Sequence, residues 1–170
     1  MERGLAVVVA VMAFLGAWTA GGQQCPELVS ALPFGYPNVV AVDGSYLVLG
    51  IGHGLVVVDQ SDPTEPRSVA RLALPGTILD VVVDQGLAYV AASEAGVRVV
   101  DLGDPASPHE LQAITLPGSV QAVAIAGDLL FAAAGGGTGV SELYAVSLLP
   151  SPSVVGSVAT QGDPLDVNVS

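Results

Sequence analysis

From residue 38 onward, apolar residues occur in short runs of four to seven, each ended by turn residues. The first such runs are Val39–Val42, Tyr46–Gly50, Leu55–Asp59 and Ser68–Leu74. Runs of this length, rich in β-branched side chains and bounded by Gly, Pro, Asp and Ser, are typical of strands. None continues for the ten or more residues that a helix needs. The pattern therefore predicts four consecutive strands.

The same four runs return about 42 residues later. They are Leu79–Asp84, Leu87–Ala92, Val97–Leu102 and Glu110–Leu116. The motif "GLVVVDQSDPTEP" begins at Gly54, and "GVRVVDLGDPASP" begins at Gly96. A third, more divergent copy spans residues 120–163 and gains about two residues, which we place within "GGGTG". A fourth begins with "PLDVNVS" at residue 164.

Four strands in a repeat of this length are typical of a propeller blade. We therefore predict an all-β protein of four-stranded antiparallel blades at residues 38–77, 78–119 and 120–163, with flanking strands in residues 23–37 and 164–170. Glu27–Leu32 is predicted to be an outer strand that closes the ring.

Propellers typically have four to eight blades, so about three blades leave the ring incomplete. An unpaired apolar blade face forgoes roughly 4–8 kcal/mol at about 25 cal/mol/Å². We therefore expect the chain to be the front portion of a longer protein, or to close by association. The isolated segment is expected to self-associate.

Each of the first two repeats ends its third strand in an Asp-Pro corner, with Asp59 and Asp62 in one and Asp101 and Asp104 in the other. Asp side chains accept backbone N–H groups two residues ahead, and Pro presets the turn, so these residues are interpreted as structural. A calcium loop is the alternative, although it requires more closely spaced oxygen ligands than two carboxylates per corner.

These motifs resemble the LVIVD repeat family, whose strand motif reads "LVVVD" and "VRVVD" here, preceded by strands such as "GLAYVAA". The resemblance covers residues 38–163, although "LYAVSLLPSP" in the third copy lacks the strand-ending Asp and the Asp-Pro corner. It implies a β-propeller in an exported or cell-surface bacterial or archaeal protein. It implies no reaction, and no catalytic residues are carried over.

The N-terminus has the layout of a secretory signal peptide, with Arg3, an apolar run from Leu5 to Trp18, and small residues after it. We expect cleavage after Gly22 and an extracytoplasmic mature chain (secreted, periplasmic or at the cell surface) without a transmembrane helix; a retained membrane anchor is the alternative. Lipidation of Cys25 is not expected, because Gln24 occupies the position where a lipobox requires a small residue.

Charge narrows the range of partners. The chain has no lysine, four arginines and a net charge of −12, whereas a nucleic-acid binder needs a basic surface. Nucleic acid is therefore not expected as a partner.

The candidate ligand-contacting residues are His53, Ser93 and Glu94, in the loops between the second and third strands of the first two repeats. These loops should share a face with the connections "LPGT" and "LPGS", and loops on a rigid scaffold commonly carry function. A solvated turn histidine is the alternative for His53. His109 follows Pro108 at the start of an outer strand, and we assign it no ligand role. "GGGTG" lacks the Lys-Ser/Thr of a phosphate loop. We assign no catalytic, cofactor or metal residues.

Two functions remain. The favoured one is a non-enzymatic, exported binding module that recognises a protein or a cell-surface ligand through its loop face. The alternative is the N-terminal part of a propeller enzyme, a lyase or a hydrolase, whose site lies largely in further blades.

Overall fold

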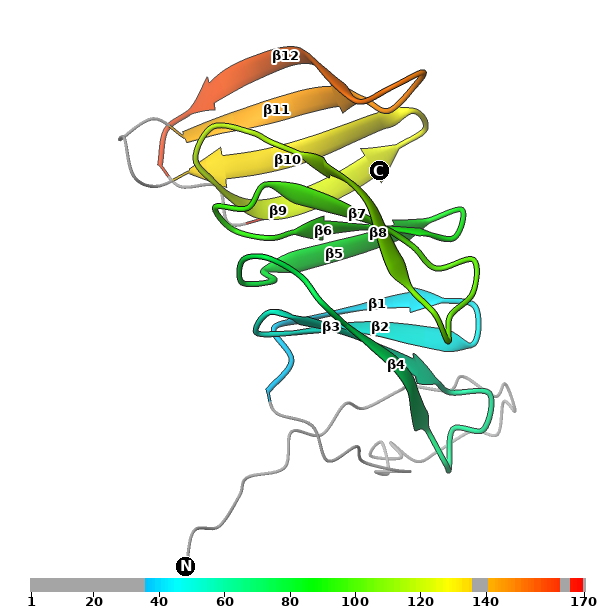
Figure 1. Cartoon of the computed structure of the whole chain (residues 1–170). Helices are drawn as coiled ribbons and strands as arrows, with labels where there is room; N and C mark the ends of the chain where they lie inside the picture. Colours follow the sequence, from blue (N-terminus) through cyan, green and yellow to red (C-terminus); the bar gives the residue numbers. More distant parts are fainter. Residues whose placement is uncertain (1–35, 136–140, 163–165, 170) are drawn as a thin grey trace, which may run out of the picture.

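The computed structural model describes residues 36–135, 141–162 and 166–169, so the predicted signal peptide, Glu27–Leu32 and most of "GGGTG" lie outside the described residues. The described strands form three four-stranded antiparallel sheets that follow one another like blades (Figure 1). The all-β, blade-like fold predicted from the sequence is confirmed.

Each blade is a meander in which consecutive strands pair. Blade 1 contains β1 (Val39–Asp43), β2 (Tyr46–Ile51), β3 (Gly54–Asp59) and β4 (Arg67–Ala73). Blade 2 contains β5 (Asp80–Asp84), β6 (Leu87–Ala91), β7 (Val97–Asp101) and β8 (His109–Ile114). Blade 3 contains β9 (Ser119–Ala126), β10 (Leu129–Gly135), β11 (Ser141–Ser147) and β12 (Ser153–Thr160). The strands predicted for the first two repeats agree with these bounds to within two residues.

Blade 3 differs from blade 2 in length at two places, and the two changes partly offset one another. Leu129 pairs with Ser147, whereas Leu87 pairs with Asp101, so the β10–β11 hairpin is four residues longer than its counterpart. The corner that follows is two residues shorter, because Ser147 pairs with Ser153 whereas Asp101 pairs with His109. The net gain of two residues seen in the sequence is therefore the difference of two changes.

The hydrophobic core lies between successive blades. We call the side of a blade that is turned toward the next blade its forward face and the opposite side its rear face. Because side chains alternate along a strand, each strand supplies both faces. The forward face of blade 1 packs on the rear face of blade 2 through a cluster that includes Val48, Leu55, Val57, Val81, Val90 and Val100.

The second interface repeats this arrangement. The forward face of blade 2 packs on the rear face of blade 3 through a cluster that includes Tyr89, Val97, Val99, Val123, Leu130 and Tyr144. Of these, Val97 and Leu130 are completely buried. The rear face of blade 1 and the forward face of blade 3 have no further blade against them among the described residues.

The outermost strand of every blade contains a β-bulge. The pairing shifts at Val57/Val58, Val99/Val100 and Ala145/Val146 leave Val69, Leu111 and Val155 as the extra residues. A bulge strengthens the local twist and turns the free edge away from other strands. Figure 1 shows β4 and β8 twisting away from the rest of their sheets. The outer edges are thereby protected from unwanted strand pairing.

No helix is present among the residues that the structure describes, and accordingly none of them forms a helix long and apolar enough to cross a membrane.

Candidate functional site

The loops of the three blades lie on two rims. The corner rim carries the hairpins after β1, β5 and β9 and the turns after β3, β7 and β11. The connection rim carries the hairpins after β2, β6 and β10 and the links from one blade to the next. We consider the two rims in turn, because the sequence motifs place acidic residues on the first and the candidate ligand residues on the second.

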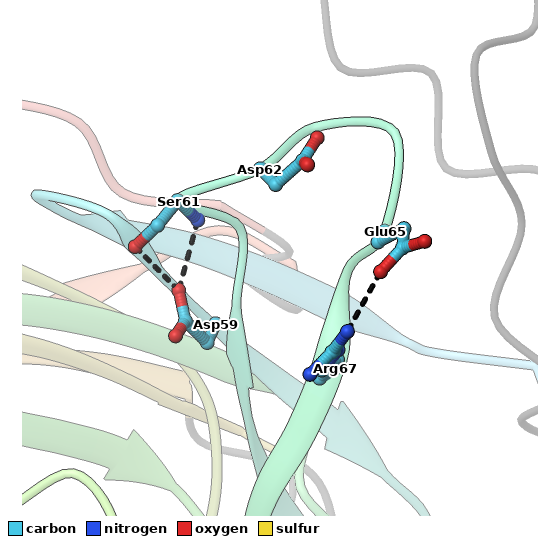
Figure 2. Close-up of a pocket in the computed structure, with 5 residues that line it drawn as sticks. All are labelled: Asp59, Ser61, Asp62, Glu65 and Arg67. Atoms are coloured by element: carbon cyan, nitrogen blue, oxygen red, sulfur yellow. Dashed lines mark hydrogen bonds and ion pairs between the residues drawn. The ribbon is translucent and has the colours of Figure 1, made fainter.

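The corner turn of blade 1 is built by two aspartates (Figure 2). Asp59 Oδ1 accepts hydrogen bonds from the backbone N–H and the hydroxyl of Ser61, at 2.8 and 2.6 Å. Asp62 Oδ1 accepts the same pair from Thr64, at 2.9 and 2.6 Å. Each carboxylate therefore fixes the backbone two residues ahead of it, as an Asx turn requires.

Blade 2 repeats the turn at the equivalent positions. Asp101 Oδ1 accepts the N–H of Gly103 at 2.7 Å, and Asp104 Oδ1 accepts the N–H of Ala106 at 3.1 Å. The structural interpretation of the four aspartates is confirmed. Among residues 36–135, 141–162 and 166–169, no group of three or more His, Cys, Asp or Glu side chains could hold a metal ion. His109 lies at this corner, with Nε2 3.9 Å from Asp101 Oδ2.

A shallow hollow at the blade 1 corner is lined by Asp59, Ser61, Asp62, Glu65 and Arg67 (Figure 2). Glu65 pairs with Arg67 at 2.7 Å, but both side chains are mostly exposed, so this ion pair contributes little. Hydrogen bonds from Ser61 lower the pKa of Asp59, and those from Thr64 lower the pKa of Asp62. Asp59 and Asp62 thus already accept hydrogen bonds from the backbone of their own turn, so the hollow is part of a structural turn.

The hydrogen bonds from Thr64 predict how the pKa of Asp62 responds to substitutions at position 64. Replacing Thr64 with valine should raise the pKa of Asp62 toward its ordinary value, because the hydroxyl bond to the charged carboxylate is the largest cause of the lowered pKa. Thr64→Ser keeps a hydroxyl and should leave that pKa low. NMR titration of the Asp62 side-chain carboxyl carbon below pH 5 measures the difference; equal values in both variants would contradict the turn geometry.

The lowered pKa also sets a direction for stability. Because the folded-state pKa of Asp62 is depressed, the stability that it contributes is present above the unfolded-state pKa of about 3.9. That contribution is lost as the pH falls through the lower folded-state value.

On the connection rim, the β2–β3 hairpin binds the link between blades 1 and 2. The Gly52 carbonyl accepts the N–H of Ile78 at 2.7 Å, and the His53 carbonyl accepts the N–H of Leu74 at 2.9 Å. The His53 side chain is exposed. The expectation that this hairpin shares a rim with "LPGT" agrees with these bonds, whereas a ligand role for His53 stays a prediction.

Ser93 occupies the corresponding place in blade 2. Its carbonyl accepts the N–H of Val120 at 3.0 Å, and its hydroxyl lies 3.0 Å from the hydroxyl of Ser119. Gln121 donates to the Ser119 hydroxyl at 3.0 Å. Ser93 adopts a positive φ of 52°, and Glu94 beside it is exposed. The structure therefore gathers Ser93, Ser119 and Gln121 into a row that the sequence motifs did not reveal, because no other repeat has the same three residues.

Asp80 is a further residue whose structural role the sequence did not predict. Its carboxylate accepts the N–H of Val81 at 2.8 Å and that of Val123 at 2.9 Å. It thereby joins the innermost strands of blades 2 and 3, β5 and β9. The only signal in the sequence is an acid at the start of an apolar strand in "LDVVV", a pattern that returns as "LDVNV" at residues 165–169.

Two tyrosines lie between blades 2 and 3. Burial raises the pKa of Tyr89. A hydrogen bond to Glu142, together with burial, raises the pKa of Tyr144 to about 12. Both phenols are therefore neutral at physiological pH and act as packing residues with a polar tip.

Three antiparallel blades, with equivalent corner turns and blade-to-blade cores, define a β-propeller-like repeat protein. The LVIVD repeat model matches residues 35–73 and 75–115, which are blades 1 and 2. Blades 1 and 2 are thus LVIVD repeats, in agreement with the sequence motifs. None of the curated proteins is similar to the chain in sequence.

Solved structures support the fold. The computationally designed Ika4 protein is similar with a TM-score of 0.68 and 13% identity, over 88% of each chain. The computationally designed Ika8 protein is similar with a TM-score of 0.64 and 12% identity, over 79% of this chain and 40% of that one. At such low identity these similarities concern the fold alone.

Proposed function

We propose that this protein is an exported, non-enzymatic binding module whose connection rim contacts a partner protein or a cell-surface ligand. The proposal rests on one observation, which is the location of the loops whose length differs between the repeats. In repeat proteins, insertions that vary between repeats map to loops on one face, which is often the binding face. Loops on a rigid scaffold can vary without disturbing the core.

The hairpins of the connection rim lengthen from blade to blade. Tyr46 pairs with Asp59, Leu87 with Asp101 and Leu129 with Ser147, so the connecting chain grows by one residue and then by four. The corner turns of blades 1 and 2, in contrast, have equal length and the same Asp hydrogen bonds. Variation between these two blades is therefore concentrated on the connection rim.

The side chains of the connection rim suit recognition by hydrogen bonding. His53 and Glu94 are exposed, while Ser93, Ser119 and Gln121 form a partly buried polar row where blade 2 meets blade 3. Such groups, positioned by a rigid backbone, can pair with the polar groups of a protein or a glycan. Export of the chain rests on the signal-peptide pattern of residues 1–22.

A photo-crosslinking amino acid at position 94 tests the proposal and captures a partner whose identity is not specified in advance. The matched control places the same amino acid at position 65, which is also an exposed Glu but lies on the corner rim. With the chain exported from cells of its source, position 94 should give discrete adducts that excess unmodified chain competes away. Mass spectrometry identifies the adducts.

The substitutions His53→Ala and Ser93→Ala should reduce the yield of those adducts. Adducts from position 65 alone, or from both positions equally, would show that the connection rim is not the binding surface. Retention of residues 1–22 on the exported chain would contradict the predicted processing.

A further inference from the structure

The outer strand of blade 3 differs from those of the other blades in its exposed side chains. Val154, Val155 and Val158 on β12 are 49, 60 and 59% exposed, and Leu149 in the corner before it is 63% exposed. Among the described strands, β12 pairs with β11 alone and lies at the edge of its sheet. Blade 3 therefore presents an apolar outer edge to solvent.

This outer edge also carries no charge. Residues 143–162, which run from β11 through the corner and β12, contain no Asp, Glu, Lys or Arg. The matching stretches of the other blades do contain charged residues, namely Asp59, Asp62, Glu65, Arg67 and Arg71 in blade 1 and Arg98, Asp101, Asp104 and Glu110 in blade 2. Charged side chains on an edge strand discourage its pairing with another strand. β4 and β8 therefore have a protection that β12 lacks.

β12 is also the outer strand with the longest regular edge. All three outer strands contain a bulge, but the regular pairing after it covers four residues in β4, three in β8 and five, residues 156–160, in β12. Figure 1 shows β12 lying alongside β11, whereas β4 and β8 twist away from their sheets. The bulge alone thus leaves residues 156–160 able to offer backbone N–H and C=O groups to a further strand.

We propose that β12 pairs with β12 of a second copy of this chain, antiparallel and about a two-fold axis at Val158. Val158 lies at the centre of residues 156–160. An axis at this point places Val158 opposite Val158 of the other copy, and Ser157 opposite Ala159. Contacts between β-branched side chains on opposed strands stabilise an antiparallel pair. The third blades of the two copies would thereby form one continuous sheet.

The charge of the chain favours a second copy at this edge over contact through the other outer strands. With a net charge of −12, two copies repel each other, so close contact is most favourable where neither carries a charge. Pairing β8 with itself would bring two copies of Glu110 together, and pairing β4 with itself would do the same for Arg67 and Arg71. A strand that pairs with β12 needs an unpaired, uncharged edge, and β12 of a second copy has both properties.

Disulfide trapping tests the two-fold axis. In the full chain with Cys25→Ser, a single cysteine replaces Val158. Opposed residues of an antiparallel pair have Cα atoms about 4.5–5.5 Å apart, a separation that a disulfide spans. Mild oxidation should therefore link most of the chain into covalent dimers. Leu111→Cys on β8 is the matched control, because Leu111 is 51% exposed on an outer strand, and it should leave the chain largely unlinked.

A charge at the axis gives a second measurement. Val158→Lys should raise the dissociation constant of the dimer, measured by sedimentation, at least about tenfold, because two ammonium groups would face each other and the contact between valines would be lost. This loss is expected even though the lysine makes each copy less negative. Leu111→Lys adds the same charge on β8 and should leave the dissociation constant unchanged. Circular dichroism should show the same β-sheet content in both variants, since both positions are exposed.

The proposal concerns β12 and does not depend on a ligand at the connection rim. A chain that stays monomeric at every concentration would overturn it. A dimer that survives Val158→Lys would show that the copies associate through another surface, and equal crosslinking at positions 111 and 158 would show that the contact is unspecific. Crosslinks from position 158 to a different protein alone would assign the edge to another partner and would also overturn the proposal.

Discussion

Replacing Gly76 with alanine is expected to destabilise the protein by about 2–5 kcal/mol. Gly76 lies in the "LPGT" link between blades 1 and 2 and has a φ of +83°. Its added Cβ would meet the Ala92 carbonyl oxygen and would lie 2.9 Å from the Ala95 Cβ. The left-handed backbone costs roughly 1–2 kcal/mol for an L-residue, and overpacking against fixed backbone typically adds about 1–3 kcal/mol. Urea unfolding measures the loss.

Two glycines with the same type of backbone separate these contributions. Gly44 has a φ of +57° and an added Cβ would have nothing within 4 Å, so Gly44→Ala should cost only the roughly 1–2 kcal/mol of the conformation. Gly118 is the counterpart of Gly76, with a φ of +84°, and its nearest neighbour would be the Gly135 carbonyl oxygen at 3.4 Å. Gly118→Ala should therefore also cost less than Gly76→Ala. Equal losses at all three positions would contradict the close approach at Gly76.

The positive φ that Gly76 and Gly118 share explains why a Pro-Gly link recurs between blades, and the close approach adds a second requirement at Gly76. The link must pass within contact distance of the β6–β7 hairpin, and Ile78 and Leu74 must donate to the hairpin before it. Only glycine has both the left-handed φ and the absence of a side chain that this path requires. The repeated "LPG" thus reflects the left-handed turn that leads from one blade to the next.

The strands and the corners could be predicted from the sequence because their causes are local. Alternating apolar residues define a strand within five or six positions, and Asp59 and Asp62 each bind backbone two residues ahead. The period of 42 residues then extended the prediction from one blade to the next, and the LVIVD resemblance agreed with it.

Other features could not be predicted because they join distant positions or depend on register. Asp80 bonds Val123 across 43 residues, and the Ser93–Ser119 contact spans 26. Neither pair is marked by a repeated motif. The bulges at Val69, Leu111 and Val155 also escaped prediction, because an extra residue in an outer strand leaves the apolar pattern nearly unchanged. The candidate site thus rests on a rim whose location was predictable and whose polar row was not.

Truncation of Leu130 to alanine is expected to cost about 2–5 kcal/mol, as for other fully buried leucines. Leu130 is completely buried in the cluster between blades 2 and 3, together with Tyr89 and Val99. That loss is a large share of the ~5–15 kcal/mol that stabilises an ordinary domain. Leu111→Ala is the control, because Leu111 is 51% exposed on β8, and it should change the stability by no more than about 0.5 kcal/mol.

Amide hydrogen exchange shows where this loss falls. In a linear repeat array each unit is stabilised by its immediate neighbours, and among the described residues blade 3 has only blade 2 to pack against. Leu130→Ala should therefore reduce protection in β9–β12 by at least about 30-fold, since 1.4 kcal/mol corresponds to a factor of ten. Blade 1, one interface away, should lose much less. A uniform loss across all three blades would show instead that they unfold as one cooperative unit, and an unchanged β9–β12 would show that the two blades do not pack through Leu130.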